Sequence, residues 1–173
     1  MTKLLMLDIC CGLKGASQAM KDRGWDVVTL DNDPKFEPDI CIDVRKWDIW
    51  GHPDLIWCSP PCTEFSRESM PWFRTGIAPD MSIFHACMDI IHEAKPRYWV
   101  IENTKGAISY FYPFIGKWKF HSAAYYLWGS FPDISGVRLE SRKEHMSSAR
   151  EAERAKIPYA LSLALAKAIE VQA

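Results

Sequence analysis

The chain has 173 residues, of which 48% are hydrophobic and 25% are charged, and such values are typical of a single globular domain with a hydrophobic core. Its formal net charge of -1 at pH 7 argues against a broad surface that grips duplex nucleic acid through the phosphates. No apolar run is long enough to span a bilayer and no secretory signal precedes the first predicted strand, so we expect a cytoplasmic protein.

Apolar runs alternate with helical patterns along most of the chain. The runs that predict strands lie at residues 3–9, 25–30, 40–42, 54–58 and 98–101. Helices are predicted over residues 16–23 and 82–94, and a last helix over residues 158–171. This alternation is typical of crossover connections, so we predict the α/β class: a single Rossmann-like domain with a mostly parallel twisted sheet and helices on both faces.

A long proline-rich segment separates the fourth predicted strand from the helix that follows it. Residues 59–81 contain Pro60, Pro61, Pro71 and Pro79. Loops of this length in compact domains tend to be lids or binding loops. We therefore expect a loop that covers the active site.

Three acidic residues are predicted at the carboxyl edge of the sheet, where parallel α/β sheets bind ligands. Asp8 lies near the end of the first strand, Asp31 follows the second and Asp43 follows the third. Asp31 is spaced to accept hydrogen bonds from a ribose diol, and Asp43 could accept one from an adenine amino group. An acid-rich edge without a full GxGxxG loop suits a cationic sulfonium, so S-adenosylmethionine fits better than NAD. The alternative is that the acids are turn formers and helix caps.

A thiol and a carboxyl group follow the fourth and fifth strands. Cys62 directly follows Pro60-Pro61 in the sequence. The two prolines fix the backbone and direct the next side chain away from the strand end. Glu102 ends the next strand, and one crossover connects the two, so the groups can share a pocket. A buried, inert thiol is the competing interpretation of Cys62. A zinc pair of Cys58 and Cys62 is disfavoured, because no second Cys or His pair has ligand spacing.

These motifs resemble the ordered signature motifs of the DNA cytosine-5 methyltransferases. The similarity rests on the loop at residues 8–15, on Ser59-Pro60-Pro61-Cys62 and on Glu102-Asn103. Asp31, Asp43 and the Ile157-Pro158 pair add weaker similarities. The resemblance implies the class I S-adenosylmethionine-dependent methyltransferase fold and methylation of carbon 5 of cytosine. In that reaction Cys62 adds to carbon 6 and Glu102 binds ring nitrogen 3.

The expected site follows from the edge residues and the resemblance together. The catalytic residues are Cys62 and Glu102. The substrate-binding residues are Pro61, Ser66, Asn103, Arg138 and Arg142. The residues that bind S-adenosylmethionine are Asp8, Cys10, Cys11, Gly12, Leu13, Gly15, Asp31, Asn32, Asp43, Val44 and Ser59, and no metal ligand is expected.

The sequence departs from the family pattern at several places. Lys14 replaces the usual Gly, Thr63 replaces a frequent Gln, and Thr104 replaces the usual Val. The Gly-Asn pair of the closing motif is replaced by Arg154-Ala155. A cofactor half (residues 1–50) and a catalytic half (51–173) fill the chain, and the charged stretch before Pro158 leaves no room for a target recognition domain.

Several substrates and partners therefore stay open. DNA is the favoured substrate, RNA or a free cytosine nucleotide is the alternative, and a homodimer or a recognition subunit is a possible partner. Rival functions are an exocyclic amino-methyltransferase, whose Pro-Pro turn is followed by an aromatic residue instead of Cys62, and a non-catalytic subunit of a nucleic-acid complex. Trp72 and Phe73 in the long loop are the aromatic residues best placed for base stacking.

Overall fold

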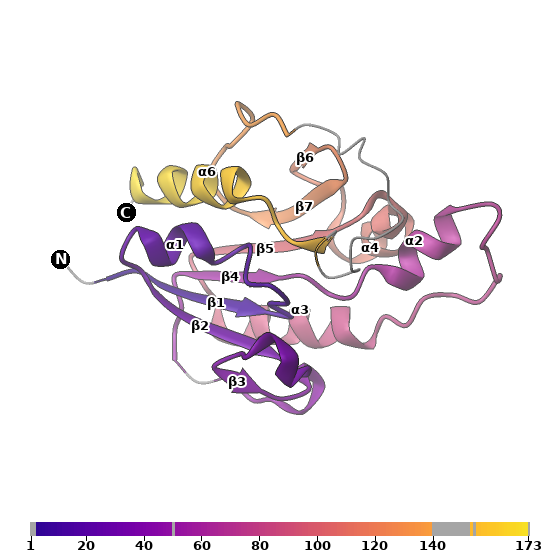
Figure 1. Cartoon of the computed structure of the whole chain (residues 1–173), viewed down its shortest axis with the longest axis horizontal. Coiled ribbons are helices and arrows are strands. Elements are labelled where there is room, and N and C mark those ends of the chain that lie inside the picture. Colours follow the sequence, from indigo (N-terminus) through magenta and orange to yellow (C-terminus); the bar gives the residue numbers. More distant parts are fainter. Residues whose placement is uncertain (1–2, 50, 140–152, 154, 173) are drawn as a thin grey trace.

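A seven-stranded sheet forms the centre of the computed structural model, which describes residues 3–49, 51–139, 153 and 155–172 (Figure 1). The strands are β1 (Leu5–Ile9), β2 (Asp26–Asp31), β3 (Ile40–Cys41), β4 (Leu55–Cys58), β5 (Tyr98–Asn103), β6 (Phe120–Ser122) and β7 (Tyr125–Ser130). Their order across the sheet is β3-β2-β1-β4-β5-β7-β6. The connection from β3 to β4 crosses β2 and β1 and places β4 at the centre of the sheet, so the strand order reverses between β1 and β4.

The predicted parallel sheet is confirmed for the first five strands, which pair in parallel and end within two residues of the predicted limits. The sequence analysis did not predict β6 and β7. These two strands form a hairpin whose turn includes Ala123 in the left-handed conformation. β7 pairs antiparallel with β5, so the fold is α/β with a mixed sheet at one edge.

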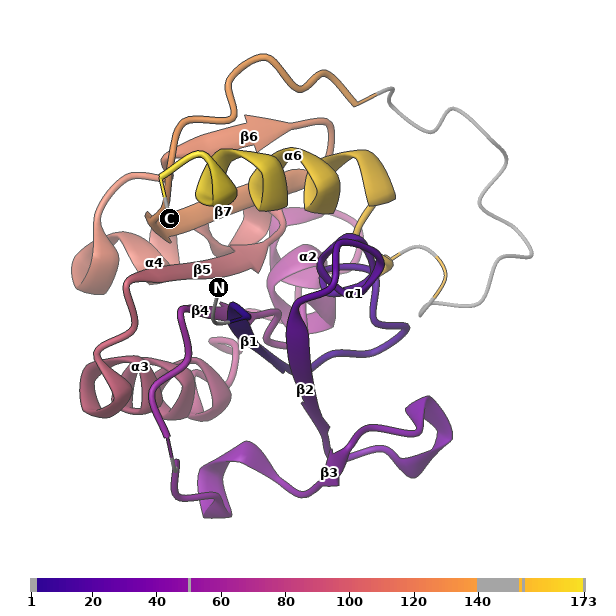
Figure 2. The ribbon, with the colours of Figure 1, turned by 90° about the vertical axis from the view of Figure 1, so that its left-hand side faces the viewer.

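Helices cover both faces of the sheet, as predicted (Figure 2). One face carries α1 (Gln18–Asp22) and α6 (Tyr159–Glu170), and the opposite face carries α3 (Ser82–Ala94) and α4 (Ile108–Ile115). Strand residues alternate between the two layers. In β4, for example, Leu55 and Trp57 pack with the α6 layer, whereas Ile56 and Cys58 pack with the α3 layer.

The segment expected to be a continuous loop contains a helix, so that prediction is wrong for its first part. Helix α2 (Thr63–Ser69) begins one residue after the two prolines, with Cys62 as its N-cap. Its first turn closes when the N–H of Ser66 donates to the carbonyl of Cys62 at 2.9 Å. Prolines that precede a helix do not interrupt its hydrogen bonds, and Glu64 in the first turn favours the helix dipole.

Short helical turns complete the connections. The 3-10 turns are η1 (Pro34–Phe36), η2 (Val44–Lys46) and η3 (Lys105–Ala107). The carboxyl ends of the five parallel strands, α2 and the segment that returns to α3 all lie at one end of the sheet (Figure 1). Within the described residues, no helix is both long and apolar enough to cross a lipid bilayer.

Candidate active site

The ends of β4 and β5 lie side by side, which the sequence predicted. Cys58 is the register partner of Ile101, so the next residues, Ser59 and Glu102, are neighbours. The indole Nε1 of Trp57 donates to the Ser59 hydroxyl at 2.8 Å, and Ser59 lies near enough to the Glu102 carboxyl to lower its pKa. Ser59 therefore lies beside the acid, and the cofactor contact expected for it stays a prediction.

Asn103 ties the proline turn to the end of β5. Its side chain is 1% exposed; Nδ2 donates to the carbonyl of Pro60 at 2.9 Å, and Oδ1 accepts from the N–H of Thr104 at 2.9 Å. Ser66 of α2 lies 3.2 Å from the Thr104 hydroxyl. The structure thus brings together the two segments that carry Cys62 and Glu102, although Asn103 itself points into the protein rather than toward solvent.

Gly106 permits the close packing of α2 against the segment after β5. A Cβ at position 106 would lie 2.2 Å from the carbonyl oxygen of Phe65, a distance that only a residue without a side chain allows. Phe65 is itself buried at 2% exposure. The helix that begins after Cys62 is therefore held against η3 at a glycine joint, which the sequence analysis did not anticipate.

Glu102 is a buried acid without a cationic partner in the described part of the chain. Burial raises the pKa of its carboxyl from 4.5 to about 8, and the nearby Ser59 side chain lowers it only in part. The group is thus mainly protonated at neutral pH. A protonated carboxyl can donate a hydrogen bond to a ring nitrogen, which an ionised one cannot.

Asp8 is the most completely buried of the three acids predicted to bind the cofactor. It is 1% exposed, and neither carboxylate oxygen accepts a hydrogen bond from the described residues. Burial raises its pKa from 3.8 to about 7. Ser17 lies near enough to lower this pKa, but its hydroxyl is directed to the Lys14 carbonyl at 3.4 Å. A buried acid with unfilled hydrogen-bonding capacity is one that a ligand could complete.

The loop after β1 has a distinctive backbone. Cys10, Gly12 and Lys14 all have positive φ values, of 56°, 46° and 57°, so Lys14 holds a left-handed conformation that glycine adopts at less cost. The N–H of Gly12 donates to Asp31 Oδ2 at 3.0 Å. The ammonium of Lys14 donates to the Glu37 carbonyl at 2.5 Å. Asp31 and the loop thus lie together, as the sequence predicted.

Gly15 has a packing role that the sequence did not reveal. A Cβ there would lie 2.4 Å from the Ile157 carbonyl oxygen and 2.7 Å from its nitrogen. The loop and the segment before α6 therefore touch backbone to backbone. Of the other loop residues predicted to bind cofactor, Cys11 is buried and Leu13 is partly exposed, while Asn32 after β2 is exposed.

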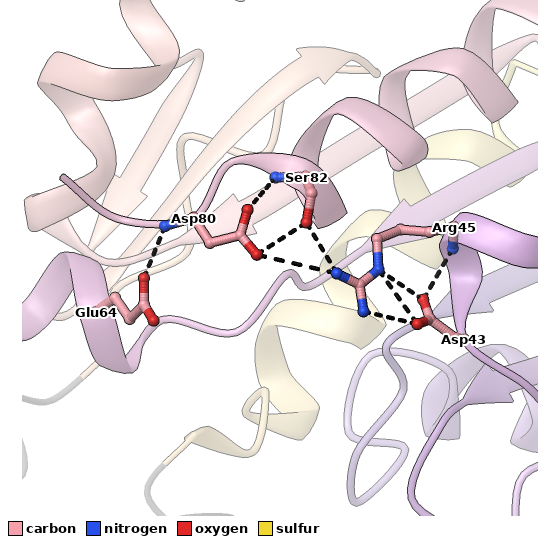
Figure 3. Close-up of polar contacts among 5 residues, drawn as sticks. All are labelled: Asp43, Arg45, Glu64, Asp80 and Ser82. Atoms are coloured by element: carbon pink, nitrogen blue, oxygen red, sulfur yellow. Dashed lines mark hydrogen bonds and ion pairs between the residues drawn. The ribbon is translucent and has the colours of Figure 1, made fainter.

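Asp43 lies after β3 and is paired with a cation (Figure 3). Its carboxylate caps η2 by accepting from the Arg45 N–H at 3.0 Å and binds the Arg45 guanidinium, with a shortest contact of 2.7 Å. The side-chain hydrogen bond with Arg45 lowers the pKa of Asp43 to about 2. Arg45 also donates to Ser82 at 3.1 Å. The next predicted cofactor residue, Val44, is 5% exposed within the α3-side core.

The same polar network continues to α2 (Figure 3). Asp80 lies 3.9 Å from the Arg45 guanidinium and accepts from the N–H and hydroxyl of Ser82. The N–H of Asp80 donates to the Glu64 carboxylate at 2.7 Å. These contacts join the end of β3 to the start of α3 and to the helix that follows Cys62.

Three predicted substrate-binding residues remain to be placed. Pro61 is exposed and Arg138 is exposed, whereas Arg142 lies outside the described residues. In the described part of the chain, no group of three or more His, Cys, Asp or Glu side chains is arranged to hold a metal ion. A common pocket for the Cys62 thiol and the Glu102 carboxyl stays a prediction.

The sequence is similar to known DNA methylases. The family model described as "C-5 cytosine-specific DNA methylase" matches residues 4–110. The "Probable DNA (cytosine-5)-methyltransferase" of Frog virus 3 (isolate Goorha) is 29% identical over 115 residues, covering 57% of this chain and 52% of that protein. The "Type II methyltransferase M.SacI" of Streptomyces achromogenes is 32% identical over 59 residues, covering 32% of this chain and 15% of that protein. The chain thus spans about half the length of the viral relative.

Solved structures share the fold. An Escherichia coli structure titled "putative DNA modification methyltransferase encoded within prophage" has a TM-score of 0.51 at 16% identity, covering 73% of this chain and 46% of that one. The Entamoeba histolytica methyltransferase EhMeth has a TM-score of 0.51 at 11% identity, covering 85% of this chain and 58% of that one. At such identities the likeness shows the fold alone. This fold agrees with the predicted methyltransferase fold.

Proposed function

Because this chain belongs to the C-5 cytosine-specific DNA methylase family, we propose that it methylates carbon 5 of cytosine with Cys62 as nucleophile and Glu102 as acid. The observation that carries the proposal is the hydrogen bond from Asn103 to Pro60. It supports a shared pocket, because it fixes the turn before Cys62 beside the strand end that holds Glu102.

The chemistry requires both groups. Carbon 5 of cytosine is a weak nucleophile, so the ring is activated when the Cys62 thiolate forms a bond to carbon 6 and pushes electrons toward nitrogen 3. Glu102, kept protonated by burial, donates to nitrogen 3 and stabilises this charge. After carbon 5 has been methylated, loss of its proton restores the double bond and breaks the bond to Cys62.

The residues at the cofactor edge fit S-adenosylmethionine. When bound, this donor supplies an electrophilic methyl group on a positively charged sulfur. Asp8 offers a buried carboxylate with no hydrogen-bond partner in the described residues, which favours a cationic ligand. Each Asp31 oxygen accepts one backbone hydrogen bond from the described residues, from Gly12 or from Asp33, and keeps a lone pair for a ribose hydroxyl. The Asp43 carboxylate already binds Arg45. To bind the cofactor as predicted, it would also have to accept a hydrogen bond from an adenine amino group.

The proposal is tested by identifying the methylated atom. The protein is incubated with isotope-labelled S-adenosylmethionine and with duplex DNA, single-stranded DNA, RNA or dCMP, and the product is analysed by mass spectrometry. We expect 5-methylcytosine in DNA. Methylation at the exocyclic nitrogen would refute the proposed chemistry, and labelling of dCMP or RNA alone would refute the proposed substrate.

A second experiment tests the nucleophile. An oligonucleotide that contains 5-fluorocytosine retains the covalent adduct, because fluorine cannot leave as a proton does. We expect a shifted band in a denaturing gel for the wild type and for Cys41→Ser, which replaces an exposed thiol on β3. The band should be absent for Cys62→Ser, and an adduct that persists in this variant would remove Cys62 from the mechanism.

A further inference from the structure

A groove lies beside the C-terminal end of α2, between the segment that follows this helix and the start of α4. Its volume is about 740 Å³. Residues that line it include Ser69, Arg74, Ile77, Lys105, Ser109 and Tyr110. Since α2 has seven residues, at ~1.5 Å per residue the groove begins about 10 Å from Cys62. We refer to it as the α2 groove.

Hydrogen bonds to the Glu68 side chain fix the conformation of the loop that follows α2. The Glu68 carboxylate is buried and accepts hydrogen bonds from the Thr75 N–H at 3.0 Å, from the Thr75 hydroxyl at 2.6 Å and from the Gly76 N–H at 3.1 Å. Arg67 also binds this carboxylate, at 3.0 Å. The negative charge of Glu68 is therefore compensated inside the loop and is not presented to the groove.

Two cations of the α2 groove have no acidic partner among the described residues. The Arg74 Nε donates to the main-chain carbonyl of Glu68 at 3.0 Å, which leaves its positive charge uncompensated. Lys105 is exposed on η3 and forms no ion pair in the described part of the chain. The groove thus offers positive charge to an anionic ligand.

Large apolar side chains stand at the tip of the same loop. Trp72 is 84% exposed, Phe73 is 65% exposed and Ile77 is 69% exposed. Contiguous exposed apolar side chains with polar neighbours mark an interaction site. Since Phe73 directly precedes Arg74, the aromatic tip is continuous with the cationic groove.

We propose that the α2 groove and its aromatic tip bind an unpaired polynucleotide strand next to the target base. Arg74 and Lys105 would contact the phosphates, and Trp72 and Phe73 would stack on bases. The proposal rests on the proposed function, since it assigns the strand that this site would hold. Cationic grooves with aromatic platforms are typical of proteins that bind single strands.

The charge of the chain favours an unpaired strand over a duplex. Duplex binding relies chiefly on phosphate contacts, whereas this chain has a net charge of -1 and two uncompensated cations in the groove. Stacking must therefore supply much of the affinity. It requires base faces that are open to the aromatic side chains, and a duplex hides these faces except at its ends.

The test measures binding of oligonucleotides without cytosine, so that it does not depend on methyl transfer. Fluorescence anisotropy is recorded with a labelled single-stranded DNA, the matching RNA and the duplex. We expect single strands to bind at least 10-fold more tightly than the duplex, and the DNA and RNA arms identify the sugar preferred. Duplex binding of equal or greater strength would overturn the proposal. It would indicate that the aromatic side chains insert between paired bases, or that contacts with the phosphates of the duplex supply the affinity.

Substitutions assign the two kinds of contact. Trp72→Ala and Phe73→Ala should each weaken single-strand binding about 5- to 150-fold, while Trp72→Phe should retain most of it. Lys105→Gln should lower the salt slope by about 0.7. Matched controls are Phe114→Ala, an exposed aromatic residue of α4, and Lys95→Gln, neither of which should change binding.

The outcomes separate this proposal from the proposed function. Wild-type affinity in both aromatic-to-alanine variants would overturn the proposal even if cytosine methylation were demonstrated. Conversely, stacking-dependent binding without any methyl transfer would support the α2 groove and refute the enzymatic assignment. Circular dichroism of each variant confirms that a loss of binding does not reflect loss of the fold.

Discussion

Glu102→Gln should separate stability from chemistry, because the buried acid is costly to the folded protein as pH rises. The folded pKa of about 8 lies above the ordinary value of 4.5. Below pH 4.5 both states are protonated and the cost is absent. Between these values only the unfolded chain ionises, so the wild type loses about 3 kcal/mol of stability by pH 7 and about 5 kcal/mol above pH 8. Glutamine has no charge in either state and avoids this loss.

The assay is urea unfolding of the wild type and the variant from pH 4 to 9. The free energy of unfolding of Glu102→Gln, relative to the wild type, should rise by about 3 kcal/mol between pH 4 and 7. Glu93→Gln, at an exposed position of α3, is the matched control and should show no such rise. Parallel pH profiles for Glu102→Gln and the wild type would refute the buried-acid reasoning. The variant should also lose adduct formation with 5-fluorocytosine, since it cannot transfer a proton to the ring.

Three further predictions concern the cofactor edge and the joints of the site. Asp8→Asn should weaken S-adenosylmethionine binding in calorimetry while raising thermal stability at neutral pH, and unchanged affinity would remove Asp8 from the donor site. Gly106→Ala should cost about 1–3 kcal/mol and lower the yield of covalent adduct, whereas Gly136→Ala, which meets open space, should leave both unchanged. Asn103→Ala should cost about 1–3 kcal/mol, because it leaves the buried Pro60 carbonyl without its donor; denaturant unfolding at wild-type midpoint would contradict this.

The sequence was informative where local pattern and global topology agree. Apolar runs located the five parallel strands, and the rule that such strands end at one edge correctly placed the end of β4 beside the end of β5 and Asp31 beside the loop after β1. Helix α2 was missed because the prolines before Cys62 resemble the punctuation of a loop. The hairpin of β6 and β7 was missed because its turn contains Ala123 rather than Gly or Asn.

Contacts between distant segments could not be predicted. Gly106 and Gly15 look like loop glycines in the sequence, and only the folded backbone shows that each faces a carbonyl at less than 2.5 Å from a would-be Cβ. The partners of Glu68 and of Asp43 depend in the same way on where loops return. Glu102 is protonated because it is buried at the end of β5. No residue pattern near position 102 predicts this burial.

The packing of α6 bears on how the protein is made in the cell. The Ser162 hydroxyl donates to the Ala16 carbonyl across 146 positions of sequence, and Leu161, Leu165 and Ile169 have no exposed surface. During synthesis on the ribosome, α6 emerges long after the segment that follows β1. The face of the sheet that carries α1 therefore stays partly uncovered until α6 has been made. A nascent chain halted before α6 should expose that apolar face and depend on chaperones.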